Sequence, residues 1–139
     1  MAKEDDAARG TAVLAVNSSD DVVRVRQEVR SRAVAAGFGI VDQTKIVTAA
    51  SELARNTFVH GGGGTVRVES VSKSGRRGVR LIFEDQGPGI PDIEQALKDG
   101  FTTGGGLGLG LGGSKRLSNE FEIDSAPGRG TRVTIARWR

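Results

Sequence analysis

The sequence predicts an α/β sandwich, in which helices cover one face of a mixed, mostly antiparallel sheet. Segments with strand and helix periodicity follow one another in the order β-α-α-β-β-α-α-β-β. That order suits helices packed on one face of a sheet. The chain has 139 residues with no internal repeat or evident linker, which suits one hydrophobic core. We therefore expect residues 1–139 to form one domain, with residues 1–10 flexible.

The first predicted elements are a strand and two helices. Residues 11–16 (TAVLAV) have the apolar content of a short buried strand, and residues 17–20 (NSSD) offer an N-cap. The helix that follows ends at Gly37 and Gly39, and a second helix runs from about Asp42 to the four glycines at 61–64. Apolar residues at helical spacing mark the buried faces of the two helices: Val22, Val25, Val29, Ala33 and Ala36, then Ile46, Ala49, Ala50, Leu53 and Thr57.

The remainder of the chain predicts two hairpins separated by two short helices. Residues 65–71 and 78–85 have strand patterns and are joined by turn residues at 72–76. Short helices are expected at 92–98 and 112–118. The last two strands, 120–125 and 130–137, are joined by the turn sequence PGRG at 127–130.

Composition excludes several classes of function. The chain has no cysteine, which rules out disulfides, zinc–thiolate sites and thiol nucleophiles. No apolar segment reaches membrane-spanning length and the N-terminus lacks a signal-peptide core, so we expect a cytoplasmic protein with no membrane partner. A net charge of +3 permits an acidic partner, but 4% aromatic residues offer little for base stacking, so no nucleic-acid partner is expected.

The run from Gly104 to Gly113 (GGGLGLGLGG) contains seven glycines in ten residues and leads into a predicted helix. Bare backbone N–H groups and a positive helix end are typical of a phosphate site. A flexible linker is also rich in glycine, so the run alone does not decide between the two.

Three polar residues, Glu52, Asn56 and His60, lie four residues apart along one stripe of the second predicted helix. A carboxylate and a carboxamide at this spacing suit Mg²⁺, which takes one or two protein oxygens together with phosphate and water. The alternative is an ordinary solvated helix face, with His60 capping the helix end.

The strand that ends at Asp85 carries its carboxylate on the same face as Val79, Leu81 and Phe83. A carboxylate on a buried face needs a partner, and the exocyclic amine of adenine is a donor, whereas guanine presents an acceptor oxygen there. Gly87 and Gly89 would let the backbone turn close to the base. The sequence D-x-G-P-G is also good turn chemistry, which is the alternative.

The last predicted strand places Thr131 on the same face as Val133 and Ile135. Its hydroxyl would support Asp85 or reach the base through water. An ordinary threonine near a strand start explains it equally well.

These segments together resemble the Bergerat-fold (GHKL) ATPases, the superfamily of gyrase, Hsp90, histidine kinases and MutL. Glu52-x-x-x-Asn56-x-x-x-His60 resembles the N box, Asp85-x-Gly87-x-Gly89 the first glycine box and Gly108-x-Gly110 the second. The segments GFGIVDQ (37–43), SELARN (51–56), EDQGPGIPDI (84–93) and DGF (99–101) resemble the anti-sigma-factor kinases and, among them, the RsbT-type serine/threonine kinases of bacterial stress signalling. The resemblance runs from about residue 11 to the C-terminus.

The resemblance implies ATP and Mg²⁺ as cofactors and a role for each matching position. Asn56 would be the Mg²⁺ ligand, and Glu52 would orient or deprotonate the attacking hydroxyl. Asp85 would bind the adenine amine. Gly87, Gly89 and Thr131 would lie near the base, Gly108 and Gly110 would touch the phosphates, and residues 92–108 would form an ATP lid.

The resemblance also implies partners. The substrate would be a serine on a STAS-domain antagonist protein, which in such systems builds a stressosome scaffold. The released kinase would then activate a PP2C-type phosphatase, and a sigma factor is a further candidate partner. The alternative is a nucleotide-gated anti-sigma factor or binding module with little kinase activity.

Two departures from the family pattern stand out. Related kinases carry an arginine before the second glycine box, where Gly106 stands here. Another cation would have to serve the γ-phosphate, and Lys98, Lys115 and Arg116 are candidates by proximity. The long glycine run also predicts a lid that is disordered without nucleotide.

Overall fold

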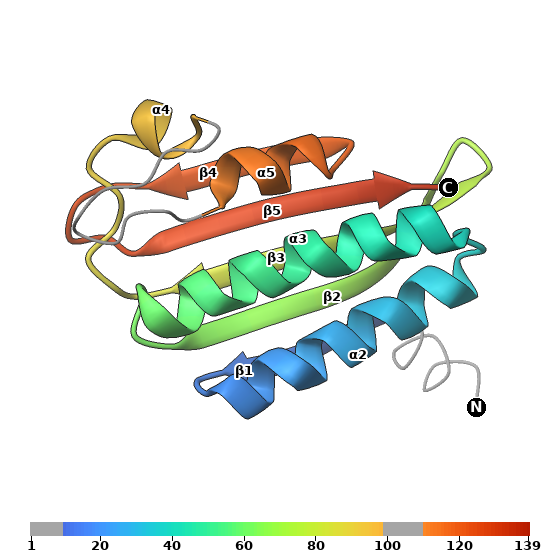
Figure 1. Ribbon diagram of the computed structural model, residues 1–139, viewed down its shortest axis with the longest axis horizontal. Helices are drawn as coiled ribbons and strands as arrows, with labels where there is room; N and C mark the ends of the chain where they lie inside the picture. The colour runs from blue at the N-terminus through green and yellow to red at the C-terminus, as the bar shows by residue number, and fades with distance from the viewer. Residues whose placement is uncertain (1–9, 99–109) are drawn as a thin grey trace.

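The computed structural model describes residues 10–98 and 110–139 and shows a helical layer against a single sheet (Figure 1). The predicted α/β sandwich and the predicted order of elements are confirmed. The chain forms β1 (Thr11–Val16), α2 (Ser19–Ala35), α3 (Ile40–Val59), β2 (Gly64–Lys73), β3 (Arg76–Asp85), α4 (Ile93–Ala96), α5 (Leu111–Arg116), β4 (Glu120–Ser125) and β5 (Thr131–Trp138). The expectation of a flexible segment at 1–10 lies almost wholly outside the described residues.

The five strands lie in the order β1-β2-β3-β5-β4, and each neighbouring pair is antiparallel. The prediction of a mixed sheet is therefore wrong for this part of the chain. The reason is the path of the chain after β3. The connection through α4 and α5 carries β4 to the sheet edge, and the hairpin then returns β5 into the place beside β3. Strand β4 runs parallel to β3 but never touches it.

The β2–β3 hairpin closes more tightly than the sequence predicts. Its turn consists of Ser74 and Gly75, with φ angles of 53° and 79°, so both residues lie in the left-handed region. Two-residue turns of this kind match the twist of antiparallel strands. The strands therefore extend to Lys73 and Arg76, into the residues expected to form a longer turn.

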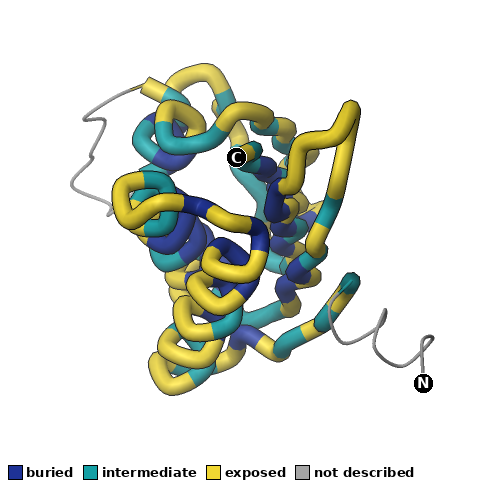
Figure 2. The backbone as a smooth tube through the Cα atoms, turned by 90° about the vertical axis from the view of Figure 1, so that its right-hand side faces the viewer, coloured by how far each residue is buried: buried dark blue, intermediate teal, exposed yellow. Residues whose placement is uncertain are grey.

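Helices α2 and α3 lie side by side on one face of the sheet, and the residues between the two layers are buried (Figures 1 and 2). The apolar stripes predicted for both helices face this core. Helix α3 starts at Ile40, slightly before the expected Asp42, because Gly39 provides the extended N-cap. No helix in the described ranges has the length and apolar character that a membrane crossing needs. The largest buried side chains are Phe83, Ile46, Leu53, Leu81, Leu111 and Ile135.

Arg137 of β5 joins three elements at the end of the sandwich away from Asp85. Its guanidinium donates to the Asp42 carboxylate at 2.6 Å and to the Leu117 carbonyl at 2.8 Å. Its side chain is only 12% exposed. This bond pair links the start of α3 and the end of α5 to β5.

Helix α2 begins with a side-chain cap that can be tested directly. Ser18 has extended backbone, and its hydroxyl accepts from the Asp21 N–H at 3.1 Å. Ser18→Ala removes this acceptor, so we expect the free energy of unfolding to fall by about 1 kcal/mol. Urea unfolding followed by circular dichroism measures this change.

The matched control is Ser19→Ala at the next position, which is exposed. Its unfolding free energy should stay within about 0.5 kcal/mol of wild type, as expected for a surface substitution. Equal effects of the two variants would show that the Ser18 cap does not stabilise α2.

Candidate functional site

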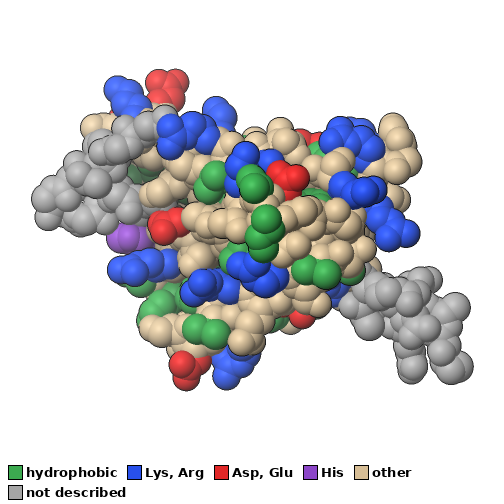
Figure 3. Space-filling view, turned by 45° about the vertical axis from the view of Figure 1, so that its right-hand side comes forward, with side chains coloured by type: hydrophobic (Ala, Val, Ile, Leu, Met, Phe, Trp, Pro, Cys, Tyr) green, Lys and Arg blue, Asp and Glu red, His purple; other side chains and the backbone are tan. Residues whose placement is uncertain are grey.

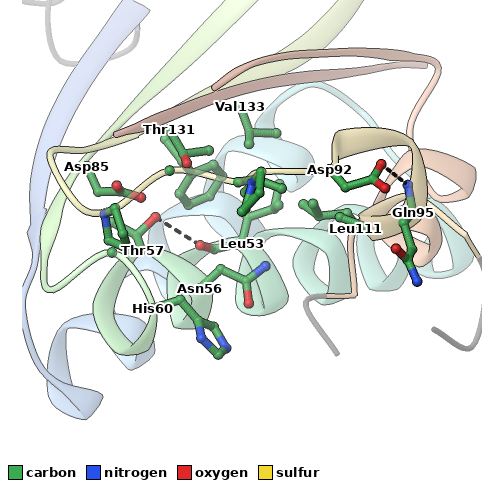
Figure 4. A pocket seen from close by; sticks show the side chains of 17 residues that line it. Leu53, Asn56, Thr57, His60, Asp85, Asp92, Gln95, Leu111, Thr131 and Val133 are labelled. Carbon is green, nitrogen blue, oxygen red and sulfur yellow. Dashed lines mark hydrogen bonds between the residues drawn. The ribbon is translucent and has the colours of Figure 1, made fainter. Parts of the chain in front are cut away.

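A cavity of about 260 Å³ lies between the C-terminal half of α3, the ends of β3 and β5 that meet at Asp85 and Thr131, and the segment from Pro88 to Ala96 (Figure 4). It lies in the helix-covered face of the sheet. The lining residues are Leu53, Asn56, Thr57, His60, Gly61, Phe83, Asp85, Pro88, Gly89, Ile90, Pro91, Asp92, Gln95, Ala96, Leu111, Thr131 and Val133.

Helix α3 contributes two of the three residues in its predicted polar stripe to this cavity. Asn56 is half-buried and His60 is exposed at the helix C-cap, and both line the cavity (Figure 4). Glu52 is exposed and lies outside the lining. Its carboxylate instead lies beside Gly110, where an added Cβ would come within 2.8 Å of Oε2. The stripe therefore reaches from the cavity to the start of α5.

Asp85 faces the cavity, as the alternation along β3 predicts, after the buried Val79, Leu81 and Phe83. Its Oδ1 accepts from the Gly87 N–H at 2.9 Å. This is the D-x-G turn that the sequence offered as the alternative. The turn uses one carboxylate oxygen and leaves the other without a hydrogen bond within the described residues, so the predicted pairing with an adenine amine is compatible with the turn and stays a prediction.

Glycines bring the backbone unusually close to Asp85. A Cβ on Gly61 would overlap the Asp85 carboxylate, and one on Gly130 would overlap the Asp85 carbonyl oxygen. A Cβ on Gly87 would lie 2.7 Å from the Gly61 carbonyl oxygen. The sequence predicts Gly61 only as a helix terminator, so its contact with Asp85 was missed. The available signal was a run of four glycines, which is longer than a helix end requires.

Thr131 lies opposite Asp85 in the β3–β5 register and lines the cavity. Its hydroxyl is 2.8 Å from the Ser125 hydroxyl and makes no hydrogen bond to Asp85. Of the two expected roles, direct support of Asp85 is not found, because the hydroxyl bonds Ser125 on β4. Contact of Thr131 with the base through water stays a prediction. Ser125 is a residue that sequence reasoning missed.

The predicted phosphate end of the site is described only in part. Gly110 has a φ of 66° and is the N-cap of α5, which is six residues long. Gly108, Gly106 and the lid segment from 99 to 108 lie outside the described residues. The first part of the expected lid is present: α4 is capped by Asp92, whose Oδ1 accepts from the Gln95 N–H at 3.0 Å.

The three cations considered as replacements for the missing arginine lie outside the lining of the cavity. Lys98, Lys115 and Arg116 are exposed, and none belongs to the lining, which in the described ranges contains no Lys or Arg. Figure 3 shows Lys and Arg side chains spread over most of this face with fewer Asp and Glu side chains among them, and His60, the single histidine, is exposed at its edge. The surface shown there is mixed in charge.

A cavity between a helical layer and an antiparallel sheet, lined by an inward aspartate, glycine turns and a helix-borne asparagine, defines a nucleotide-binding α/β sandwich. Comparison with known proteins gives the family. Residues 41–139 match the family of histidine kinase-, DNA gyrase B- and HSP90-like ATPases, and the chain belongs to this family.

Individual relatives show which kinds of protein this chain is similar to. The chain is 50% identical over 118 residues to the serine/threonine-protein kinase RsbT of Bacillus subtilis (strain 168), covering 85% of this chain and 89% of the relative. It is 31% identical over 124 residues to the anti-sigma F factor of Thermoanaerobacter sp. (strain X514), covering 81% and 86%. It is 33% identical over 101 residues to the anti-sigma F factor of Bacillus licheniformis, covering 68% of each. The resemblance to RsbT-type kinases is thereby confirmed.

The contact between Gly61 and Asp85 yields a test of the cavity. Gly61→Ala would push the carboxylate out of place, since Gly61 has no left-handed φ and the three atoms nearest to an added Cβ all belong to the Asp85 side chain. We expect ATP affinity to fall by about 10-fold to 100-fold, the usual cost of losing a hydrogen bond to a charged group. Isothermal titration calorimetry measures it.

Gly10→Ala is the matched control, because a Cβ there meets nothing within 4 Å. Its ATP affinity should equal that of wild type. Unchanged ATP binding in Gly61→Ala would mean that the nucleotide does not depend on the position of Asp85.

Proposed function

We propose that this protein is an ATP-dependent kinase that phosphorylates a serine of a STAS-domain antagonist protein. The main support is that Asn56 and Asp85 line one cavity in a chain that is 50% identical to a serine/threonine-protein kinase over 85% of its length. ATP use follows from membership of the ATPase family. The identity of the protein that receives the phosphate is part of the proposal.

Adenine recognition is assigned to Asp85. Its carboxylate only accepts hydrogen bonds, so it pairs with the exocyclic amine of adenine and disfavours the acceptor oxygen of guanine. The apolar walls of Leu53, Phe83 and Val133 suit the faces of a purine ring. Gly89, with a φ of 78°, gives the loop after β3 its turn at this wall.

Magnesium is assigned to Asn56. The described residues contain no group of three or more His, Cys, Asp or Glu side chains that would hold a metal by themselves. The donor set fits Mg²⁺, which usually binds one or two protein oxygens together with phosphate oxygens and water. When bound, Mg²⁺ would neutralise charge on the phosphates.

Glu52 is assigned the role of orienting or deprotonating the attacking serine hydroxyl. The carboxylate is exposed and lies beside Gly110, the first described residue of the glycine run that we assign to the phosphates with Gly108. A substrate serine arriving from solvent would therefore meet Glu52 near the group to be transferred. A base within hydrogen-bond reach is what general base catalysis requires.

The proposed partners are those that the resemblance to RsbT-type kinases implies. The STAS-domain protein, alone or in a stressosome scaffold, is the phosphate acceptor, and the released kinase then activates a PP2C-type phosphatase. A cytoplasmic location follows from these partners. Relatives named anti-sigma F factor make a sigma factor a further candidate partner.

One observation favours a second function, a nucleotide-gated binding module with little kinase activity. The described lining of the cavity contains no Lys or Arg. Phosphoryl transfer depends on neutralising charge around the transferred group, so a cavity without such a cation suits nucleotide binding better than rapid transfer.

Glu52→Gln tests the assigned base. Incubation with labelled ATP, Mg²⁺ and a cognate STAS-domain protein should show phosphate transfer reduced by about 100-fold to 10,000-fold, the range for loss of a general base. ATP affinity should stay near that of wild type, because Glu52 lies outside the cavity lining. Glu122→Gln, an exposed carboxylate on β4, is the control and should transfer at the wild-type rate.

Rapid transfer by Glu52→Gln would exclude the base role. Wild-type protein that binds ATP, captures a sigma factor and transfers no phosphate would favour the binding module instead.

A further inference from the structure

Ser125 lies at the centre of a hydrogen-bond network behind the adenine end of the cavity. Its Oγ is 2.9 Å from the Ile90 N–H donor, 2.9 Å from the Gly130 carbonyl oxygen and 2.8 Å from the Thr131 hydroxyl. Ile90 and Thr131 both line the cavity, whereas Ser125 does not. Ser125 therefore contacts the binding surface from behind.

The protons in this network have one arrangement that satisfies every group. The Ile90 amide can only donate, and the Gly130 carbonyl can only accept. A serine hydroxyl has a single proton, which must go to Gly130. The Thr131 hydroxyl then has to donate its own proton to the lone pair that remains on Ser125.

The acceptor that determines this arrangement is held rigidly. Gly130 is buried, has a φ of 76° and packs so closely on the Asp85 carbonyl that no Cβ fits. On the other side, the Gly128 N–H donates to the Pro88 carbonyl at 2.7 Å, which ties the 126–130 turn to the loop after β3. These contacts hold Gly130 in place, so its carbonyl stays the acceptor for the Ser125 proton.

The consequence concerns what Thr131 offers to a ligand. With its proton committed to Ser125, the Thr131 oxygen presents only lone pairs to the cavity. The neighbouring Asp85, opposite Thr131 in the strand register and on the same wall in Figure 4, also only accepts. The two polar side chains at this end, Asp85 and Thr131, thus both present acceptors to the base.

We infer that Ser125 is a positioning residue for nucleotide specificity: it fixes the Thr131 hydroxyl as an acceptor, so that the cavity selects a base with an exocyclic amine over one with a carbonyl oxygen. This inference rests on the proposed function. Without Ser125, the Thr131 hydroxyl would be free to rotate and donate to the guanine oxygen.

The experiment compares the affinities of wild type and Ser125→Ala for Mg-ATP and Mg-GTP by calorimetry. We expect the ratio of ATP to GTP affinity to fall by about 10-fold in Ser125→Ala, because a mismatched acceptor pair becomes a hydrogen bond. If Ser125 had a purely structural role, Ser125→Ala would weaken the binding of ATP and GTP equally. The ratio of their affinities would then be unchanged. Ser118→Ala is the matched control, since among the described residues that hydroxyl bonds only the Ser114 carbonyl, and Ser118 lies outside the cavity lining.

The dependence on Thr131 is tested by a double-mutant cycle with Thr131→Val. The ratio should fall in Thr131→Val, and adding Ser125→Ala should not lower it further, because Ser125 acts through that hydroxyl. An additional fall in the double variant, or an unchanged ratio in Ser125→Ala, would overturn the inference. Should Ser125→Ala fail to fold, Ser125→Cys keeps the side-chain shape with a weak hydrogen-bonding group and gives the same test.

The result for wild type separates this inference from the function on which it rests. Wild-type protein that binds neither ATP nor GTP contradicts the proposed function. Wild-type protein that binds both equally, or that prefers ATP with a ratio unaffected by Ser125→Ala, contradicts only the role of Ser125.

Discussion

The close packing of backbone around Asp85 is the constraint on which the rest of the site depends. The carboxylate lies against Gly61 at the end of α3, accepts from the Gly87 N–H, and belongs to a residue whose carbonyl packs on Gly130. These contacts join a helix end, a loop and a strand start that are far apart in the sequence. Since no Cβ fits at Gly61 or Gly130, the separation of the helical layer from the sheet edge is set here. The position of the Asp85 carboxylate, which we propose binds adenine, follows from it.

The two ends of the site are built differently. The end proposed to bind the base consists of packed glycine backbone and the bonded hydroxyls of Ser125 and Thr131, so its hydrogen bonds are already formed without a ligand. At the phosphate end, the described chain contributes Asn56, Glu52 and Gly110. Under the proposed function, selectivity for the base is a property of this preformed hydrogen-bond network. For phosphate transfer, the charge on the phosphates would have to be neutralised by groups beyond the described lining. The proposed kinase needs such groups, whereas the alternative binding module does not.

Local patterns predicted the parts of the site that depend on a single element. Alternation along β3 placed Asp85 inward, and helical spacing placed Asn56 and His60 on one stripe, both of which the structure bears out. Contacts between elements were not predictable in this way. The bond from the Ile90 amide to Ser125 spans 35 residues, and neither residue carries a local pattern that indicates it. The assignments of catalytic and metal-binding roles stay predictions.

The sequence by itself determined the kind and order of the elements and the inward face of each, because apolar periodicity and glycine positions act over a few residues. It also carried the motifs that assign the chain to its ATPase family. Only the tertiary structure decided that the sheet is antiparallel between all neighbouring strands, that Gly61 lies on Asp85, and that Thr131 bonds Ser125 and not Asp85. These outcomes depend on contacts between segments that are distant in the sequence. Such contacts are determined by the packing of the whole core and by the need to satisfy every buried polar group.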